Sequence, residues 1–164
     1  MRAIWLGLLA FGPMLLEARL SRRHERALRA AGAVEPPGDV YRVMQIVYPA
    51  AFLAMIGEGW VRGADGPEAP IAGAAVFAAG KAVKYWAIAT LGSRWTFRVL
   101  VPPGSHRTTR GPYRVLRHPN YVGVAAELAG IALMARAPYA GTAAVVGFSA
   151  LLLIRIRVEE RALG

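Results

Sequence analysis

Five apolar segments of about membrane-crossing length constrain this chain more than any other feature of its sequence. They cover about residues 3–20, 41–61, 70–91, 120–135 and 138–154. A helix needs about 20 apolar residues to cross the hydrocarbon core of a bilayer, with about 17 as the lower limit. Charged residues make up only 18% of the chain, compared with about 25% in an average soluble domain. The sequence therefore predicts an all-α integral membrane protein of one domain, residues 1–164, with about five transmembrane helices and a polar cytoplasmic linker before the fourth.

The distribution of arginines predicts how these helices are oriented. Four arginines fall in the loop 21–39, six in the linker 92–117 and three in the tail 155–164. The opposite side carries only Arg2, Arg62 and Arg136. Because cytoplasmic segments are enriched in Lys and Arg, we expect the N-terminus outside and the linker and C-terminus in the cytoplasm. The high content of Ala, Gly and Arg suggests a bacterial source, and hence the inner (plasma) membrane of a bacterium.

The first apolar segment also resembles a signal peptide, because Arg2 precedes it. It ends in LLEARLSRRHER, however, with no small-residue cleavage site beside it. We therefore expect it to remain as the first span, followed by a basic helical turn that stops at Pro36–Pro37. A net charge of +10 would also fit a nucleic-acid-binding protein. Since the arginines cluster in cytoplasmic loops, we expect them to contact membrane lipids and expect no nucleic acid partner.

Several charged residues fall within the predicted spans, among them Glu17, Glu58, Lys81, Lys84 and Glu127. Such groups usually face the interior of a bundle and pair with one another. Lys84 and Glu127 lie seven residues from the cytoplasmic ends of their spans, which places both roughly 10 Å below the same surface at about 1.5 Å per residue. We expect them to pair, in a structural rather than a catalytic role. Lys81 is expected either to reach a carboxylate or to line a polar cavity.

The start of the fourth span combines several polar residues. Pro119 suits the first turn of a helix because its missing N–H costs nothing there. Backbone donors at that turn are typical of an anion-binding position, and His118, Asn120 and Tyr121 surround it. A simple helix cap is the alternative interpretation.

The end of the chain, LLLIRIRVEERALG, carries a second polar group. Arg155 and Glu159 are i,i+4 neighbours on one face of a helix that continues the fifth span. The alternative here is a basic helix end whose side chains reach the membrane surface and form ordinary ion pairs.

Together these two stretches resemble the signature of the isoprenylcysteine carboxyl methyltransferase family, integral membrane enzymes that use S-adenosylmethionine. The likeness runs from Lys84 onward. The residues that carry it are Gly111, Tyr113, Arg117, His118, Pro119 and Tyr121, then Arg155, Glu159 and Glu160. The stretches ARLSRRHERALRAAGAVE and KYWAIATLGSRWTFRV further resemble short bacterial members that methylate alkylpyrones or alkylresorcinols.

The resemblance implies a cofactor site and an acceptor site. The residues that it assigns to S-adenosylmethionine are Tyr113, His118, Pro119, Asn120, Tyr121 and Glu159, with 105–108 as a weaker candidate. It assigns acceptor binding, and with it the catalytic role, to Arg155. The expected acceptor is a lipophilic small molecule or lipidated group with a carboxylate or acidic hydroxyl, which a guanidinium orients without a base. A weakly acidic resorcinol hydroxyl would need a base, for which His106 or Glu160 are the candidates.

Three alternatives remain open at the level of sequence. Sterol reductases share a related C-terminal architecture, although they are usually longer. Phospholipid N-methyltransferases are nearer relatives that the motif does not exclude. A non-catalytic membrane protein or small transporter subunit would explain Lys81, Lys84 and Glu127 equally well. The chain has no cysteine, which excludes cysteine nucleophiles and thiolate metal sites, and no metal site is expected.

Overall fold

Five helices and two short 3₁₀ turns form the part of the chain that this computed structural model describes, residues 2–63 and 71–163. The helices are α1 (Arg2–Ala30), α2 (Tyr41–Val61), α3 (Ile71–Leu91), α4 (Pro119–Ala135) and α5 (Pro138–Leu163), and the turns are η1 (Gly92–Arg94) and η2 (Gly111–Arg114). Four of the helices are long and apolar enough to cross a membrane, and α4 is a shorter apolar helix. The predicted all-α membrane architecture is confirmed.

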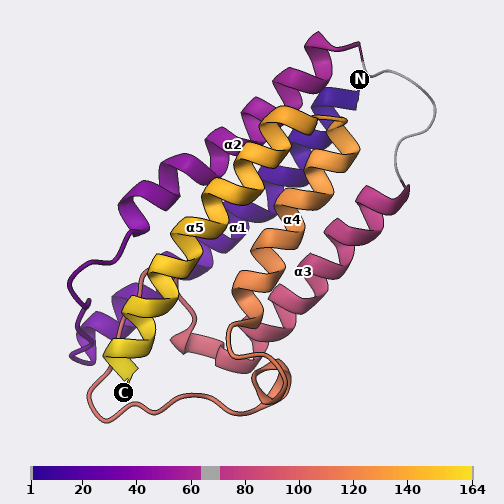
Figure 1. Ribbon diagram of the computed structural model, residues 1–164. Helices are drawn as coiled ribbons and strands as arrows, with labels where there is room; N and C mark the ends of the chain where they lie inside the picture. Colours follow the sequence, from indigo (N-terminus) through magenta and orange to yellow (C-terminus); the bar gives the residue numbers. More distant parts are fainter. Residues whose placement is uncertain (1, 64–70, 164) are drawn as a thin grey trace.

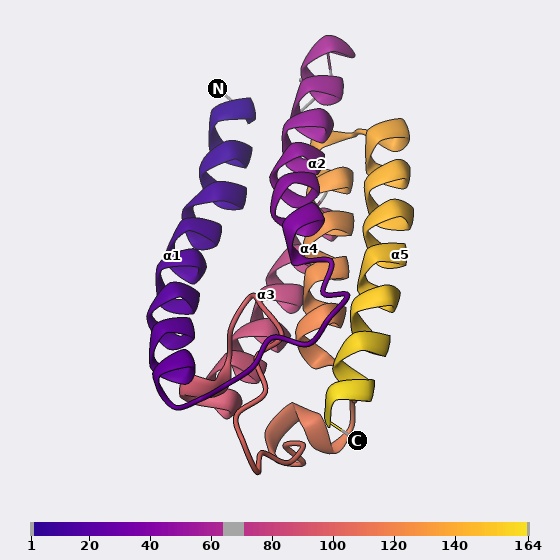
Figure 2. The same cartoon turned by 90° about the vertical axis from the view of Figure 1, so that its left-hand side faces the viewer.

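The helices lie side by side along one common direction, and the two chain ends lie at opposite ends of the bundle (Figure 1). The C-terminus, the loop 31–40 and the linker 92–118 gather at one end, called the linker end below. Figure 2 shows α1 at one edge of the bundle, with the linker passing below it towards the end of α5. This arrangement agrees with an odd number of spans, while the side of the membrane that each end faces stays a prediction.

Glycines let α3 and α4 lie in close contact. A Cβ atom on Gly80 would come 2.9 Å from the carbonyl oxygen of Gly123, and one on Gly123 would come 2.8 Å from that of Gly80. A Cβ atom on Gly130 would come 2.6 Å from Cβ of Phe77. Small residues allow such close approach between membrane helices, which associate through van der Waals packing rather than through a hydrophobic driving force. Because the linker leaves α3 and enters α4, this tight pair fixes both of its ends.

Four charged side chains form a buried ion quartet in the bundle: Glu17 of α1, Lys81 and Lys84 of α3, and Glu127 of α4. Lys84 Nζ lies 3.2 Å from Glu127, which confirms the predicted pair. Lys81 Nζ lies 2.9 Å from Glu17 and 3.0 Å from Glu127, so it reaches two carboxylates. Lys84 also contacts Glu17 at 2.6 Å, and the Tyr48 hydroxyl of α2 donates to Glu127 at 2.7 Å. The quartet has no net charge and connects α1, α3 and α4.

Glu58, another charged residue of the predicted spans, lies at the other end of the bundle. Its carboxylate accepts backbone N–H groups from Tyr139 (3.3 Å) and Ala140 (2.6 Å) in the first turn of α5. A carboxylate there satisfies donors that have no partner within the helix and interacts favourably with the helix dipole. Glu58 therefore anchors α5 to α2, far from the linker end.

The first helix extends beyond the membrane span predicted at about residues 3–20. The helix α1 does not end with the apolar run near residue 20 but continues to Ala30, because Arg, Glu, Ala and Leu are strong helix formers whether or not lipid surrounds them. It stops before Gly32, whose φ of +83° no regular helix accepts, rather than at Pro36 and Pro37. At the other end of the chain, α5 continues through Arg155 and Glu159 to Leu163, as predicted.

Candidate functional site

A cavity of about 340 Å³ lies within the bundle, towards the linker end. Each of the five helices and the linker contribute to its wall. Towards the linker end the wall is polar and aromatic, with residues such as Tyr113 and Glu159, whereas α1 and α2 contribute apolar side chains such as Met14 and Met44. Lys84 of the ion quartet lines it as well. Its volume falls within the range of about 300–1,000 Å³ typical of small-molecule sites.

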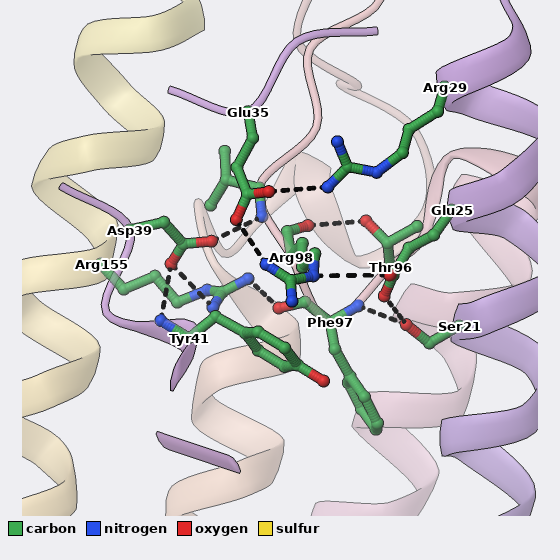
Figure 3. Close-up of polar contacts among 11 residues, drawn as sticks. Ser21, Glu25, Arg29, Glu35, Asp39, Tyr41, Thr96, Phe97, Arg98 and Arg155 are labelled. Atoms are coloured by element: carbon green, nitrogen blue, oxygen red, sulfur yellow. Dashed lines mark hydrogen bonds and ion pairs between the residues drawn. The ribbon is translucent and has the colours of Figure 1, made fainter. Parts of the chain in front are cut away.

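Arg155 is the most deeply buried arginine of this site, with 4% of its surface exposed. Its Nε donates to the Tyr121 hydroxyl at 2.9 Å, and Nη1 forms an ion pair with Asp39 at 3.1 Å. The Nη2 group donates to the carbonyl oxygen of Phe97 (Figure 3). Nη1 also lies 3.8 Å from Sδ of Met44, a weak acceptor. A guanidinium carries five N–H donors, so these oxygen partners fix the group and leave up to two donors for a ligand.

Tyr121 connects Arg155 to a second polar group. Its hydroxyl donates to Glu159 at 2.8 Å, and its ring stacks on that of His118 with 5.6 Å between the ring centroids. The His118 ring lies 3.7 Å from Glu159 through Nδ1 and 3.4 Å from Glu160 through Nε2. Hydrogen bonding to the Glu159 carboxylate raises the pKa of His118, although burial opposes the shift. The two carboxylates therefore favour the protonated form of His118 more than water would.

The other predicted cofactor residues occupy different positions around the cavity. Asn120 lines it and accepts a hydrogen bond from Nε1 of Trp95 at 3.3 Å. Tyr113 lines it from η2, and burial raises the pKa of its phenol. Pro119 is fully buried and does not line the cavity. Its contribution is to begin α4, with His118 as the residue before the helix, as predicted.

Residues 95–99 of the linker, called the roof segment below, cover this site and were not predicted to belong to it. The Phe97 N–H donates to Oγ of Ser21 at 2.8 Å, and the Trp95 carbonyl lies 2.8 Å from Nδ1 of His24. The Val99 N–H donates to Oδ2 of Asp39 at 3.0 Å. Both α1 and the loop 31–40 thus hold the roof segment through its backbone. Its signal in the sequence was the pair of aromatic residues Trp95 and Phe97 in a linker rich in arginine.

A cluster of charges ties the loop 31–40 to the linker beside the roof segment. Glu35 accepts from Arg29 and from Arg98, each at 2.7 Å, and Arg98 also lies 3.6 Å from Glu25. The Arg98 guanidinium stacks over the ring of Tyr41, 4.5 Å from its centroid. Partial burial acts to raise the pKa of Glu35, but the two arginines outweigh it and hold that pKa below its usual value. The cluster thus connects α1, the loop 31–40 and the start of α2 to the roof segment.

The weaker candidates lie outside the cavity. Residues 105–108 do not line it, and Thr108 instead accepts a hydrogen bond from Arg94 at 2.7 Å. His106 is exposed and also does not line it. Glu160 lies behind His118 and pairs with Arg117 at 3.6 Å. Neither residue considered as a base for a weakly acidic hydroxyl is therefore placed in the cavity wall.

Comparison with known proteins identifies similar chains. The model of the isoprenylcysteine carboxyl methyltransferase (ICMT) family matches residues 73–164, which include every predicted site residue. The chain is 32% identical to the uncharacterized protein YpbQ of Bacillus subtilis (strain 168), over 90% of this chain and 88% of that one. It is 28% identical to an uncharacterized protein of Haemophilus influenzae (strain ATCC 51907 / DSM 11121 / KW20 / Rd), over 88% of this chain and 84% of that one. No solved structure matches the chain significantly.

Proposed function

Since this chain belongs to the isoprenylcysteine carboxyl methyltransferase family, we propose that it transfers a methyl group from S-adenosylmethionine to an acidic oxygen of a lipophilic acceptor at the membrane. One observation carries this proposal. Arg155 and Glu159, one turn apart on α5, are joined by the Tyr121 hydroxyl in the wall of a single cavity. An acceptor-binding cation and a cofactor-binding carboxylate would then hold their ligands side by side.

The chemistry of the wall fits S-adenosylmethionine. The Glu159 carboxylate is an acceptor for ribose hydroxyls or an amino group, and the His118 ring, whose pKa that carboxylate raises, is an N–H donor for a carboxylate. The aromatic rings of Tyr113 and Trp95 line the same cavity and suit an adenine ring or a sulfonium cation. When bound, the cofactor supplies an electrophilic methyl group.

Arg155 would orient the oxygen that accepts this group. Asp39 already neutralises the charge of Arg155. The guanidinium would therefore orient the acceptor through directed hydrogen bonds rather than attract it through net charge. An acidic oxygen is deprotonated at neutral pH and needs positioning more than it needs a base. His106 and Glu160 do not line the cavity, which favours a carboxylate or an acidic hydroxyl over a resorcinol as the acceptor.

The apolar part of the wall supports a lipophilic acceptor. Met14 and Leu15 of α1, Met44 of α2, and Phe148 and Leu152 of α5 line it. Leu15 also exposes 58% of its surface, so the wall is continuous with the outer face of α1 that would contact lipid. We propose that the acceptor reaches the cavity from the bilayer. The cofactor would come from the cytoplasm, with the N-terminus outside and the linker end inside the plasma membrane of a bacterium.

Calorimetric binding of S-adenosylhomocysteine to the detergent-purified protein tests the cofactor site. We expect binding by the wild type and at least about tenfold weaker binding by His118→Ala and Glu159→Ala, because a hydrogen bond to a charged group contributes about 1.5–3 kcal/mol. Glu58→Gln is the matched control, since Glu58 lies at the other end of the bundle. No binding by folded wild-type protein would overturn the proposal.

A second assay follows labelled methyl groups from S-adenosylmethionine into lipid extracts of bacterial membranes. We expect transfer by the wild type. Arg155→Lys should lose transfer while it still binds S-adenosylhomocysteine, because a lysine cannot reproduce the planar fork of hydrogen bonds. Equal transfer by both proteins would remove Arg155 from the reaction.

A further inference from the structure

Apolar packing alone holds α1 only weakly to the rest of the bundle. Its large apolar side chains face mainly outward, among them Ile4, Trp5, Leu8, Leu15 and Leu16. In a bilayer such side chains gain little from contacting other helices rather than lipid. Glu17 is different, because it is buried and lies within 3 Å of the ammonium groups of both Lys81 and Lys84. The ion quartet is therefore the strongest connection between α1 and α3.

The face of α1 that carries Glu17 also carries the contacts to the roof segment. Ser21 and His24 follow Glu17 at i+4 and i+7, which places all three on one side of the helix. Ser21 accepts the N–H of Phe97, and His24 lies 2.8 Å from the carbonyl of Trp95. The docking of α1 and the position of the roof segment thus depend on the same helix face.

The roof segment in turn positions Arg155. The N–H of Phe97 bonds to Ser21 on α1, and the carbonyl of the same residue accepts from Nη2 of Arg155 (Figure 3). Displacing α1 would move that carbonyl away from the guanidinium. Tyr121 and Asp39 would still hold Nε and Nη1. The guanidinium would therefore keep its place but lose one of the three oxygen partners that fix its orientation.

We propose that Glu17 is a positioning residue for Arg155. Its two ion pairs dock α1 against α3, and the docked helix holds Phe97 where its carbonyl orients the guanidinium towards the acceptor. The part of this inference that concerns the acceptor rests on the proposed function, whereas the docking of α1 does not. Neither the family match nor the similar proteins assign a role to Glu17, which lies outside the matched residues 73–164.

The ion quartet provides a matched pair of variants for the test. Glu17→Met alone would leave two lysines facing one carboxylate, and the protein could fail to fold around this unbalanced charge. Glu17→Met with Lys81→Met leaves the neutral Lys84–Glu127 pair and removes the ion pairs of α1. Glu127→Met with Lys81→Met also removes one charge of each sign but leaves Lys84 paired with Glu17, so that α1 stays docked.

Hydrogen exchange of the backbone amides of Phe97 and Val99, measured without ligand, reports on the roof segment. We expect exchange about tenfold faster in the Glu17 double variant, because local opening exposes these amides. The Glu127 double variant should match the wild type within about twofold. Equal exchange in the two double variants would overturn the docking role of Glu17.

Methyl transfer and cofactor binding separate positioning from general loosening. The Glu17 double variant should bind S-adenosylhomocysteine within about threefold of the wild type, yet lose about tenfold or more in methyl transfer, because orientation contributes to the reaction rate. A parallel loss of both would overturn the positioning role. If the wild type binds no S-adenosylhomocysteine, the proposed function fails, and the exchange comparison still decides whether Glu17 docks α1.

Discussion

Asp39 gives the sharpest test of how the site is held together. Only 2% of its side-chain surface is exposed. It forms an ion pair at 3.1 Å with Arg155, whose side chain is 5% exposed. Oδ1 also accepts the N–H of Tyr41, and Oδ2 accepts that of Val99. Asp39→Asn removes the charge and replaces one of these oxygens by an NH₂ group. That group would face an N–H donor whichever way the amide turns.

The cost follows from the burial of the pair. At an effective dielectric constant of about 20, two unit charges 3.1 Å apart attract by about 5 kcal/mol. Removing one partner of a buried pair typically costs about 3–5 kcal/mol. Since Arg155 keeps its bonds to Tyr121 and Phe97, we expect the lower end, about 3 kcal/mol. This loss corresponds to a roughly 150-fold change in the folding equilibrium.

Reversible unfolding in mixed detergent micelles, followed by tryptophan fluorescence, measures this loss. The variant Asp39→Asn with Arg155→Met serves as the second arm, because it removes both charges. The free energy of unfolding that this double variant loses should be about 2 kcal/mol smaller than the sum of the losses in Asp39→Asn and in Arg155→Met, as for residues in direct contact. A cost below about 0.5 kcal/mol for Asp39→Asn, the range of ordinary surface substitutions, would refute this account of the site.

Two further predictions concern the helix pair and the protonation of the site. Gly130→Ala should destabilise the protein by about 1–3 kcal/mol in the same unfolding assay, because the added Cβ would lie 2.7 Å from the backbone nitrogen of Phe77. Gly7→Ala is the control, with no heavy atom within 4 Å of its Cβ, and should be neutral or stabilising. Bonding to Glu159 raises the pKa of His118 above 6.5, so the stability from the protonated ring should be complete below pH 6.5 and lost as the pH rises through the raised value. His118→Gln should abolish that pH dependence, and an unchanged profile would contradict the pairing.

The sequence predicted the parts of the structure that depend on local pattern. Apolar length located the helices, and Pro119 marked the start of α4. Helical spacing placed Arg155 and Glu159 on one face of α5. The pairing of Lys84 with Glu127 was predicted from their equal depth, because the membrane surface is a common reference for both helices.

The parts that were missed depend on contacts between segments far apart in the chain. Nothing near Asp39 in the sequence indicates that it meets Arg155, 116 positions away. Glu17 was noted as a charge within a span, but its partners on α3 depend on which face of α1 turns inward. Trp95 and Phe97 lie in a linker without periodicity, where no spacing rule predicts which side chains turn towards the cavity.

The ion quartet has a consequence for the synthesis of this protein. Glu17 and Lys81 are 64 residues apart in the chain. Because a ribosome adds about 5–20 residues per second, roughly 3–13 s pass between the synthesis of Glu17 and that of Lys81, its first partner in the quartet. A carboxylate costs up to about 3.5 kcal/mol at the centre of an inserting helix and less towards its end, where Glu17 lies in the predicted span 3–20. We therefore expect α1 to pack against the bundle only after α3 has been translated, because Glu17 meets its two lysines only then. Docking of α1 would thus be coupled to a helix that is made after it.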